Sequence, residues 1–407
     1  MKKILVTLVV AFSLVLNVNA FELSSKDVIL YNLNENKIIY DENKDEQTSI
    51  ASLTKIMTTL VAIEHITDMD KKVTMTSDMF EGLAEANAAV VGLTIGQKVT
   101  YKDLLYGMFV ESGADATRGI AISLAGSEDK FVDWMNDKAK ELGLTGTHFV
   151  NTTGLDEDGH YSTVSDVATL LMNALKNDTF KTIFTTKSYT LSDGSMTIYS
   201  TLKKSASMYG LNIDYIEGAK TGYTLDAGRC LASLAYDEAN DIEYLLVTTK
   251  ASISTSNAYH ILDATKVYTY YFNNYKYHNL VDKGDLILTL PTKYGKVSEV
   301  NIYAADDVKY YLENTFNKDD VTLDYKGVDI VKTGMNAGDK LGTMDIIYKG
   351  EVLKTIDVLL AEKVNFSLGV FLKENIIAVL IGILLIGLLV YIRINKIKIK
   401  RRKKRRK

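Results

Sequence analysis

Residues 52–66 read Ser-Leu-Thr-Lys-Ile-Met-Thr-Thr-Leu-Val-Ala-Ile-Glu-His-Ile and combine an apolar helical pattern with a hydroxyl and an amine at their start. The apolar side chains recur every three or four residues and form a broad stripe, which predicts a buried helix. Ser52 and Lys55 stand three residues apart, so their side chains lie on one face, one turn from each other. Neighbouring segments must cover this helix.

Burial of Lys55 would make the serine-lysine pair reactive. Removal from water disfavours an ammonium ion, so the pKa of a buried Lys55 falls, and its neutral amine can accept the proton of Ser52. The helix N-terminus also offers unpaired backbone N–H groups and a positive dipole end to a developing oxyanion. We therefore expect Ser52 to be a nucleophile and Lys55 its base.

The Ser-x-x-Lys pattern occurs a second time, at residues 127–130. There the serine begins a charged segment, Glu128-Asp129-Lys130, which favours a capped and solvated helix start. We expect no catalysis from this copy.

Lys-Thr-Gly also occurs twice, at residues 220–222 and 332–334. The later copy precedes Asn336 and Gly338 and favours a turn. The earlier copy lies just before an apolar strand predicted from Arg229. Its glycine lets a substrate backbone lie close, and Lys220 and Thr221 can hold a carboxylate.

The segments around the first helix mix strand and helix patterns. Residues 27–33 and 37–40 predict a hairpin, and late apolar strands are predicted at 229–236 and 243–248. The other predicted helices are residues 101–109, 114–124, 130–142, 163–175 and 256–272. Strands at both ends with helices between them predict an α/β (α+β) arrangement in which the first and last strands meet.

Beyond about residue 275 the pattern changes to short alternating runs separated by Gly, Asp and Asn, which predict a small all-β domain. The predicted strands are residues 285–290, 297–303, 321–325, 343–348 and 351–360.

Both ends of the chain carry apolar segments. Residues 1–20 combine two lysines, an apolar run and a small-residue end at Ala20, and they predict a cleaved signal peptide. Residues 376–392 form a second apolar run that can cross a hydrocarbon core of about 30 Å. Eleven Lys and Arg follow it, which predicts a tail held in the cytoplasm and an extracellular catalytic domain on a single-pass membrane protein. The expected division is a signal peptide (1–20), a catalytic domain (21–275), a β domain (276–364), a transmembrane helix (375–393) and a basic tail (394–407).

The exported part is acidic. Of the 47 Lys and Arg, 13 lie at the two ends, which leaves 34 against 50 acidic residues between positions 21 and 373, a charge near −16. Such a surface repels phosphate backbones, so we expect no nucleic-acid partner. The lone Cys230 excludes an intramolecular disulfide, and the five histidines show no metal-ligand spacing, so we expect neither a metal nor another cofactor.

Several stretches together resemble the D-alanyl-D-alanine carboxypeptidases of the low-molecular-weight penicillin-binding proteins, the serine peptidases with Ser-x-x-Lys, Ser-x-Asn and Lys-Thr-Gly motifs. The matching stretches are residues 51–58, 104–107, 112–116, 149–155, 160–163 and 218–224. The resemblance implies a β-lactamase/transpeptidase-like domain, with an antiparallel sheet flanked by helices, across residues 21–275. The following β domain resembles the family's second domain without a diagnostic motif.

The resemblance also implies an acyl-enzyme mechanism on peptidoglycan stem peptides. Lys55 would activate Ser52 to attack the D-Ala–D-Ala bond, and the backbone N–H groups of Ser52 and Tyr223 would form the oxyanion hole. Ser112 would relay a proton to the leaving D-alanine.

Lys220 would help that transfer, and with Thr221 it would receive the terminal carboxylate beside Gly222. β-Lactam antibiotics would acylate the same serine.

The second motif departs from the family pattern, because Ala114 stands where the family has asparagine. Loss of a hydrogen-bonding partner in a buried site costs roughly 1 to 3 kcal/mol, or about one to two powers of ten in rate. Adjacent Asp115 points elsewhere on a helix and is not expected to substitute. The alternatives are therefore a catalytically weakened penicillin- or peptidoglycan-binding protein and a β-lactamase-like hydrolase. The latter needs a group that activates the deacylating water, and the sequence offers no clear glutamate for that role.

Overall fold

The computed structural model describes residues 21–404, so the predicted signal peptide lies outside the described residues. The chain divides after Asn273 into two compact units, which are described separately.

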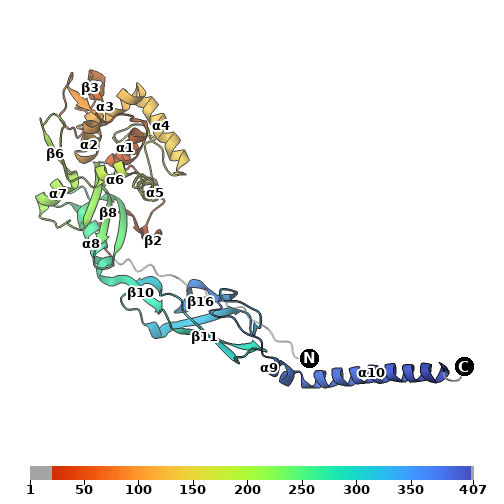
Figure 1. The fold of residues 1–407 in the computed structure, drawn as a ribbon. Coiled ribbons are helices and arrows are strands. Elements are labelled where there is room, and N and C mark those ends of the chain that lie inside the picture. The colour runs from red at the N-terminus through yellow and green to blue at the C-terminus, as the bar shows by residue number, and fades with distance from the viewer. Residues whose placement is uncertain (1–20, 405–407) are drawn as a thin grey trace, which may run out of the picture. The chain divides into compact units, whose positions relative to one another are not determined.

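A five-stranded antiparallel sheet forms the centre of the first unit, in the order β2-β1-β9-β8-β7 (Figure 1). The strands are β1 (Asp27–Asn32), β2 (Lys37–Glu42), β7 (Ile216–Thr224), β8 (Gly228–Asp237) and β9 (Ile242–Ala251). Ile29 of β1 pairs with Val247 of β9, which confirms that the first and last strands of this unit meet. In the sequence, the helices within residues 54–209 therefore lie between two strands, β1 and β9, that are distant along the chain but adjacent in the sheet.

Six helices cover one face of the sheet. They are α1 (Thr54–His65), α2 (Tyr101–Val110), α3 (Ala114–Ala125), α4 (Glu128–Glu141), α5 (Val164–Ala174) and α6 (Asp178–Phe184). Their apolar side chains share a core with Ile29, Ala232 and Leu245 of the sheet. Helix α1 is the central one, because nine of its twelve residues, Thr54 to Ala62, are buried.

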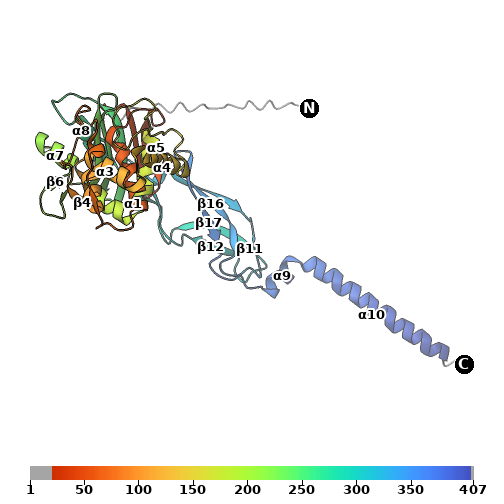
Figure 2. The ribbon, with the colours of Figure 1, turned by 90° about the horizontal axis from the view of Figure 1, so that it is seen from above.

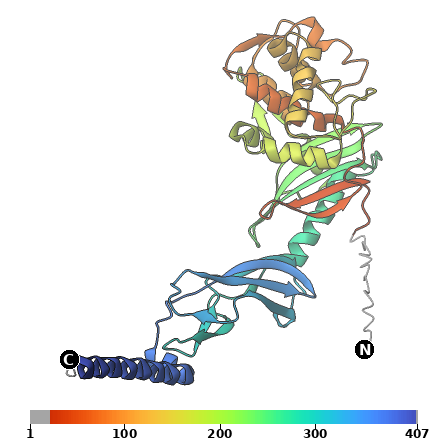
Figure 3. The same cartoon turned by 90° about the vertical axis from the view of Figure 1, so that its right-hand side faces the viewer.

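The other face of the sheet is covered by α8 (Tyr259–Asn274), which lies opposite the helical layer (Figure 3). The hydroxyls of Ser233 and Tyr268 lie 2.9 Å apart across this interface, and Tyr244 packs on Tyr271 and Phe272. Consecutive residues of β8 and β9 thus face opposite layers, as strand geometry requires. Helix α8 starts three residues later than the sequence pattern predicted.

Several elements of the first unit were not predicted. They include α7 (Thr201–Tyr209), the pairs β3 (Lys72–Thr74) with β4 (Lys98–Thr100) and β5 (Ser188–Thr190) with β6 (Thr197–Tyr199), and above all β7. Lys220-Thr221-Gly222 precede the strand that begins at Gly228 (β8), as predicted, but they also lie inside edge strand β7, which was not predicted. Gly218 and Gly222 interrupt the run of β-forming residues in this strand. A Cβ on Gly218 would lie 2.5 Å from the ring of Phe184, and one on Gly222 would lie in tight contact, 3.0 Å, with the Cβ of Ala51.

The second unit is built from β-strands, as predicted. Its sheets are β10 (Tyr275–Val281) with β13 (Val308–Glu313); β12 (Glu299–Tyr303), β11 (Leu286–Lys293) and β15 (Val331–Lys332); and β14 (Val321–Gly327), β16 (Lys340–Tyr348) and β17 (Glu351–Leu359). Leu290, Ile302, Met344 and Val358 share one core, which joins β11, β12, β16 and β17. Figure 2 labels these four strands. Strand β10 occupies the segment in which the sequence pattern predicted the boundary between the two domains but no strand.

Two helices end the described chain, α9 (Leu368–Glu374) and α10 (Ile376–Lys404). Residues Ile376–Arg402 form a helix that is long and apolar enough to cross a membrane, and none of its most apolar window is buried against protein. The helix continues through residues 394–404, for which the sequence pattern predicted a separate basic tail.

Candidate active site

Ser52 lies in a tight turn in front of α1. Ala51–Leu53 form a single 3₁₀ turn, and α1 begins at Thr54, so Ser52 precedes the helix rather than opening it as predicted. Ala51 has a φ of 47°, which is uncommon for a residue with a Cβ. Such strain persists only where surrounding contacts hold it and is often found at functional sites.

Lys55 lies in the first turn of α1 and points at Ser52. Its Nζ is 3.0 Å from Ser52 Oγ and 2.6 Å from the carbonyl oxygen of Thr153. A neutral amine has two N–H donors and one lone pair. One N–H can therefore donate to Thr153 while the lone pair accepts the Ser52 proton.

The surroundings of Lys55 favour this neutral form. Burial lowers the pKa of its amine to about 7, although the carboxylate of Asp115 acts in the opposite direction. Desolvation dominates because the side chain is only 2% exposed. At neutral pH a large share of the protein thus carries a base beside Ser52.

Ser112 comes to the same place from the turn between α2 and α3. Its φ of 64° is a second left-handed conformation at a residue with a Cβ. Lys220 Nζ donates to Ser112 Oγ at 2.9 Å, so a third chain segment meets the serine. Two hydroxyl-amine pairs, Ser52 with Lys55 and Ser112 with Lys220, are therefore assembled.

Lys220 is buried because of its place on β7. Gly218, Lys220 and Gly222 alternate as buried positions on one face of the strand, where Gly218 lies against Phe184 of the helical layer and Gly222 against the nucleophile turn. Burial, and then the positive charge of Lys55, lowers the pKa of Lys220 well below its ordinary value. The positive charges of the two lysines thus repel each other, and an anionic substrate group bound beside them would offset this repulsion.

The rest of the predicted Lys-Thr-Gly site lies along the same strand. A Cβ on Gly222 would be 3.1 Å from the backbone nitrogen of Ser52, so glycine lets β7 lie against the nucleophile turn. Thr221 Oγ1 lies 2.6 Å from Thr201 Oγ1 of α7. The side chain of Tyr223 is exposed. The structure therefore brings Ser52, Lys55, Ser112 and Lys220 together, with Thr221, Gly222 and Tyr223 following along the strand.

The family's asparagine position is occupied by a buried methyl group, Ala114. Asp115 is also buried, and its carboxylate accepts from the backbone nitrogens of Val91, Gly92 and Leu93 at 2.8 to 3.0 Å. It therefore fastens the preceding loop and has no hydrogen bond to Lys55.

Sequence reasoning missed the loop of residues 151–154. Asn151 Oδ1 accepts from the backbone nitrogens of Thr153 and Gly154 at 3.2 and 2.8 Å, which shapes the turn that presents the Thr153 carbonyl to Lys55. Gly154 has a φ of 81°, and a Cβ there would lie 1.9 Å from the carbonyl oxygen of Ala51. The Asn-Thr-Thr-Gly residue types of this stretch are themselves a signal for such a turn, because Asn and Gly favour turns.

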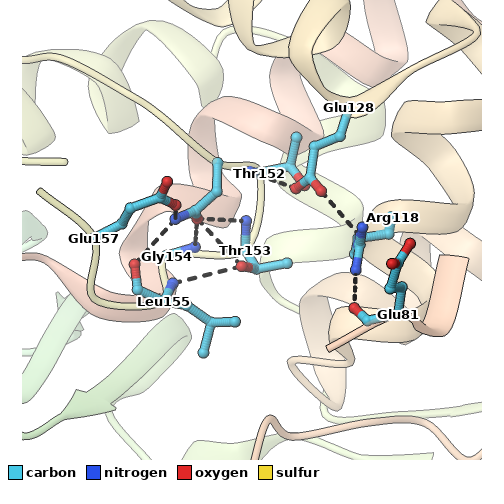
Figure 4. A network of polar contacts seen from close by, with 9 residues as sticks. Glu81, Arg118, Glu128, Thr152, Thr153, Gly154, Leu155 and Glu157 are labelled. Atoms are coloured by element: carbon cyan, nitrogen blue, oxygen red, sulfur yellow. Dashed lines mark hydrogen bonds and ion pairs between the residues drawn. The ribbon is translucent and has the colours of Figure 1, made fainter. Parts of the chain in front are cut away.

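The same loop is tied to a polar network that Figure 4 shows. Glu128 Oε1 accepts from the backbone nitrogen and the hydroxyl of Thr152 at 3.1 and 2.6 Å. Its other oxygen forms an ion pair of 2.9 Å with Arg118 Nε. The backbone beside Lys55 is thus anchored to α3 and α4.

His160, for which the sequence indicated no role, is buried beneath the nucleophile helix. Val150 N–H donates to its Nδ1 at 3.2 Å, so Nε2 carries the hydrogen and donates to Thr54 Oγ1 at 2.8 Å. Burial lowers the pKa of His160 to about 4. The neutral ring therefore fixes Thr54, the first residue of α1.

The duplicate motifs lie outside this site. Ser127 caps α4 by accepting from the backbone nitrogen of Lys130. Gly334 has a φ of 97° in a turn of the second unit. Cys230 is a buried strand residue, and burial raises the pKa of its thiol to about 12.

Comparison with known proteins places the two parts of the chain in two families. Residues 15–252 match the D-alanyl-D-alanine carboxypeptidase family. Residues 275–365 match the C-terminal domain of penicillin-binding protein 5.

Individual relatives extend over most of the chain. The D-alanyl-D-alanine carboxypeptidase DacF of Bacillus subtilis is 30% identical over 336 residues, which cover 81% of this chain and 83% of that protein. DacC of Escherichia coli, also a D-alanyl-D-alanine carboxypeptidase, is 28% identical and covers 87% of this chain and 88% of its own.

Solved structures share the architecture. The Streptomyces K15 DD-transpeptidase has a TM-score of 0.55 at 28% identity and covers 62% of this chain and 98% of its own. Penicillin-binding protein 5 of Haemophilus influenzae has a TM-score of 0.60 at 21% identity, over 84% of this chain and 98% of its own, a likeness that concerns the fold alone.

Proposed function

The chain belongs to the D-alanyl-D-alanine carboxypeptidase family, and from this premise we propose that it removes the terminal D-alanine from peptidoglycan stem peptides through an acyl-enzyme on Ser52. The observation that carries the proposal is the 3.0 Å contact between Ser52 Oγ and the buried amine of Lys55. β-Lactams acylate the same hydroxyl in this account.

Acylation begins with transfer of the Ser52 proton to the neutral amine of Lys55, while Oγ forms a bond to the carbonyl carbon of the penultimate D-alanine. The lowered pKa of Lys55, about 7, supports this role because the acceptor is available at neutral pH. The backbone N–H groups of Ser52 and Tyr223 stabilise the oxyanion.

Collapse of that intermediate breaks the peptide bond and requires a proton on the leaving amine. The proton passes from the Lys55 ammonium to the leaving nitrogen through the hydroxyl of Ser112, which Lys220 holds at 2.9 Å. Lys220 and Thr221 bind the terminal carboxylate. A charged partner there offsets the cost of two buried amines that lie close together.

Deacylation repeats these steps with water. Lys55, neutral again, accepts a proton from the attacking water, whose oxygen bonds to the acyl carbon. The Ser52–carbonyl bond breaks, and Lys55 returns the proton to Ser52 Oγ. No metal or other cofactor takes part in this scheme.

Incubation of the purified chain with a peptide that ends in D-Ala–D-Ala tests the proposal. We expect stoichiometric release of free D-alanine and competition by penicillin. Long-lived penicillin labelling without D-alanine release would indicate a binding protein, and rapid loss of the label with hydrolysis of the drug would indicate a β-lactamase.

We further propose that α10 anchors the protein as a single span with the catalytic unit outside the cell. The apolar helix Ile376–Arg402 and the lysines and arginines that follow its apolar part support this orientation. Protease added to intact spheroplasts should remove the catalytic unit and leave the basic tail protected. Protection of the catalytic unit would contradict the orientation.

A further inference from the structure

Residues 127–130 supply no nucleophile, yet Glu128 is bonded to the loop that holds Lys55. We propose that Arg118 and Glu128 are positioning residues that fix the backbone of Thr152 and Thr153, so that the Thr153 carbonyl keeps the Lys55 amine against Ser52. The inference rests on the proposed function, because Lys55 requires positioning only if it serves Ser52.

The connection runs through contacts on three chain segments. One oxygen of Glu128 accepts from both the backbone nitrogen and the hydroxyl of Thr152, at 3.1 and 2.6 Å (Figure 4). The other oxygen pairs with Arg118 at 2.9 Å, and Arg118 also donates to the carbonyl oxygen of Glu81. One carboxylate therefore ties the loop to α3.

These charges are well shielded from solvent. The side chains of Arg118 and Glu128 are 19% and 20% exposed, and Thr152 is fully buried. A largely buried ion pair contributes little net stability, but removal of one partner leaves the other charge poorly compensated. The main effect of the Arg118–Glu128 ion pair is therefore to fix the position of the groups bonded to it.

The loop that Glu128 holds is in turn hydrogen-bonded to side chains of α1. The carbonyl oxygen of Thr152 accepts from Thr58 Oγ1 at 2.8 Å, and that of Thr153 accepts from Lys55 Nζ at 2.6 Å. Two consecutive carbonyls thus engage side chains one turn apart on α1. A movement of Thr152 by about 1 Å would lengthen the Thr153–Lys55 contact beyond hydrogen-bonding range.

Such a movement would also admit water to Lys55. Burial is the largest cause of the lowered pKa of this amine, so hydration raises the pKa and reduces the neutral fraction at pH 7. The charged or titratable groups around Lys55 are Asp115 on α3, Lys220 on β7 and His160. None of these is altered by a substitution at Glu128.

The test compares Glu128→Gln, Arg118→Gln and the double variant with the unmodified chain, all full-length in detergent. The rate of acylation by fluorescent penicillin is measured from pH 5 to 9, with thermal unfolding followed by the fluorescence of Trp134. Asp129→Asn is the matched control, because it removes the adjacent exposed negative charge from the same first helical turn.

We expect each single variant to acylate about fivefold more slowly at pH 7, with the midpoint of the pH profile about one pH unit higher, because a rise of the pKa from about 7 to about 8 lowers the neutral fraction at pH 7 from about a half to about a tenth. The double variant should be no slower than the singles, because both act through one contact. The control should match the unmodified chain. A merely structural role would lower the unfolding temperature and leave the pH midpoint unchanged.

Wild-type rate and pH midpoint in folded Glu128→Gln and Arg118→Gln proteins would overturn the inference. If Glu128→Gln does not fold, Thr152→Val, which loses the 2.6 Å hydroxyl bond alone, should show a smaller rise of the midpoint, and an unchanged midpoint would overturn the inference equally. Absence of labelling in the unmodified chain would instead contradict the proposed function.

Discussion

The pH dependence of Ser52 acylation follows from the burial of Lys55. At its ordinary pKa of 10.5 this amine would be neutral in about 3 of 10,000 molecules at pH 7, whereas at a pKa of about 7 half of the molecules carry the base. Burial thus raises the reactive population by about three orders of magnitude. Because the neutral form reacts, the acylation rate should rise about ninety-fold from pH 5 to pH 8 and level off above that pH.

Time-resolved labelling with fluorescent penicillin measures this profile on the full chain in detergent. Lys55→Arg is the matched control, because a guanidinium stays charged at every pH used. Its rate should be flat with pH and lower than that of the unmodified chain by a factor of more than about 10³ at pH 7. A rate independent of pH between 5 and 8 in the unmodified chain, or a midpoint above pH 9, would refute the role of a neutral Lys55.

Three further outcomes are expected. Gly154→Ala should lower D-alanine release more than about tenfold, because the new Cβ would lie 1.9 Å from the Ala51 carbonyl oxygen; activity within twofold of wild type would contradict the packing of this loop on the nucleophile turn. Ala114→Asn should raise D-alanine release about tenfold by supplying donors and an acceptor in the buried site, and an unchanged or lower rate in a folded protein would show that the methyl group is not a handicap. His160 is neutral in the fold at a pKa of about 4, below the 6.5 of a free histidine, so the unfolded chain binds the extra proton between these values. Stability present above pH 6.5 should therefore be lost as the pH falls toward 4, seen as a falling unfolding temperature by Trp134 fluorescence and a smaller fall in His160→Gln.

The layered fold of the first unit could be predicted because long segments had clear periods. The helix pattern of residues 52–66 and the strand patterns near both ends of the unit required a covered sheet, and the pairing of β1 with β9 met that expectation. Strand β7 was not predicted, because it has glycines, Gly218 and Gly222, in place of β-forming residues where Phe184 and the nucleophile turn approach the backbone. The glycines of β7 thus reflect close contacts with segments distant in the sequence, which a local sequence pattern does not reveal.

The candidate site was predictable where a side chain carries the chemistry. Ser52, Lys55, Ser112 and Lys220 are recognisable residue types at characteristic spacings, and the structure assembles them. The Thr153 carbonyl and the Arg118–Glu128 pair were not predictable, because a backbone acceptor has no residue type and Glu128 stands 24 residues before Thr152, to which it is bonded. The sequence also put Ser52 within the helix, since a 3₁₀ turn and an α-helix differ little in apolar pattern.

Covalent capture of penicillin by the unmodified chain and by Ser52→Ala tests the central claim most directly. After labelling and proteolysis, mass spectrometry should find the adduct on the peptide that contains Ser52 in the unmodified chain and no adduct in Ser52→Ala. An adduct of similar yield in Ser52→Ala, on Ser112 or any other residue, would show that the nucleophile lies elsewhere.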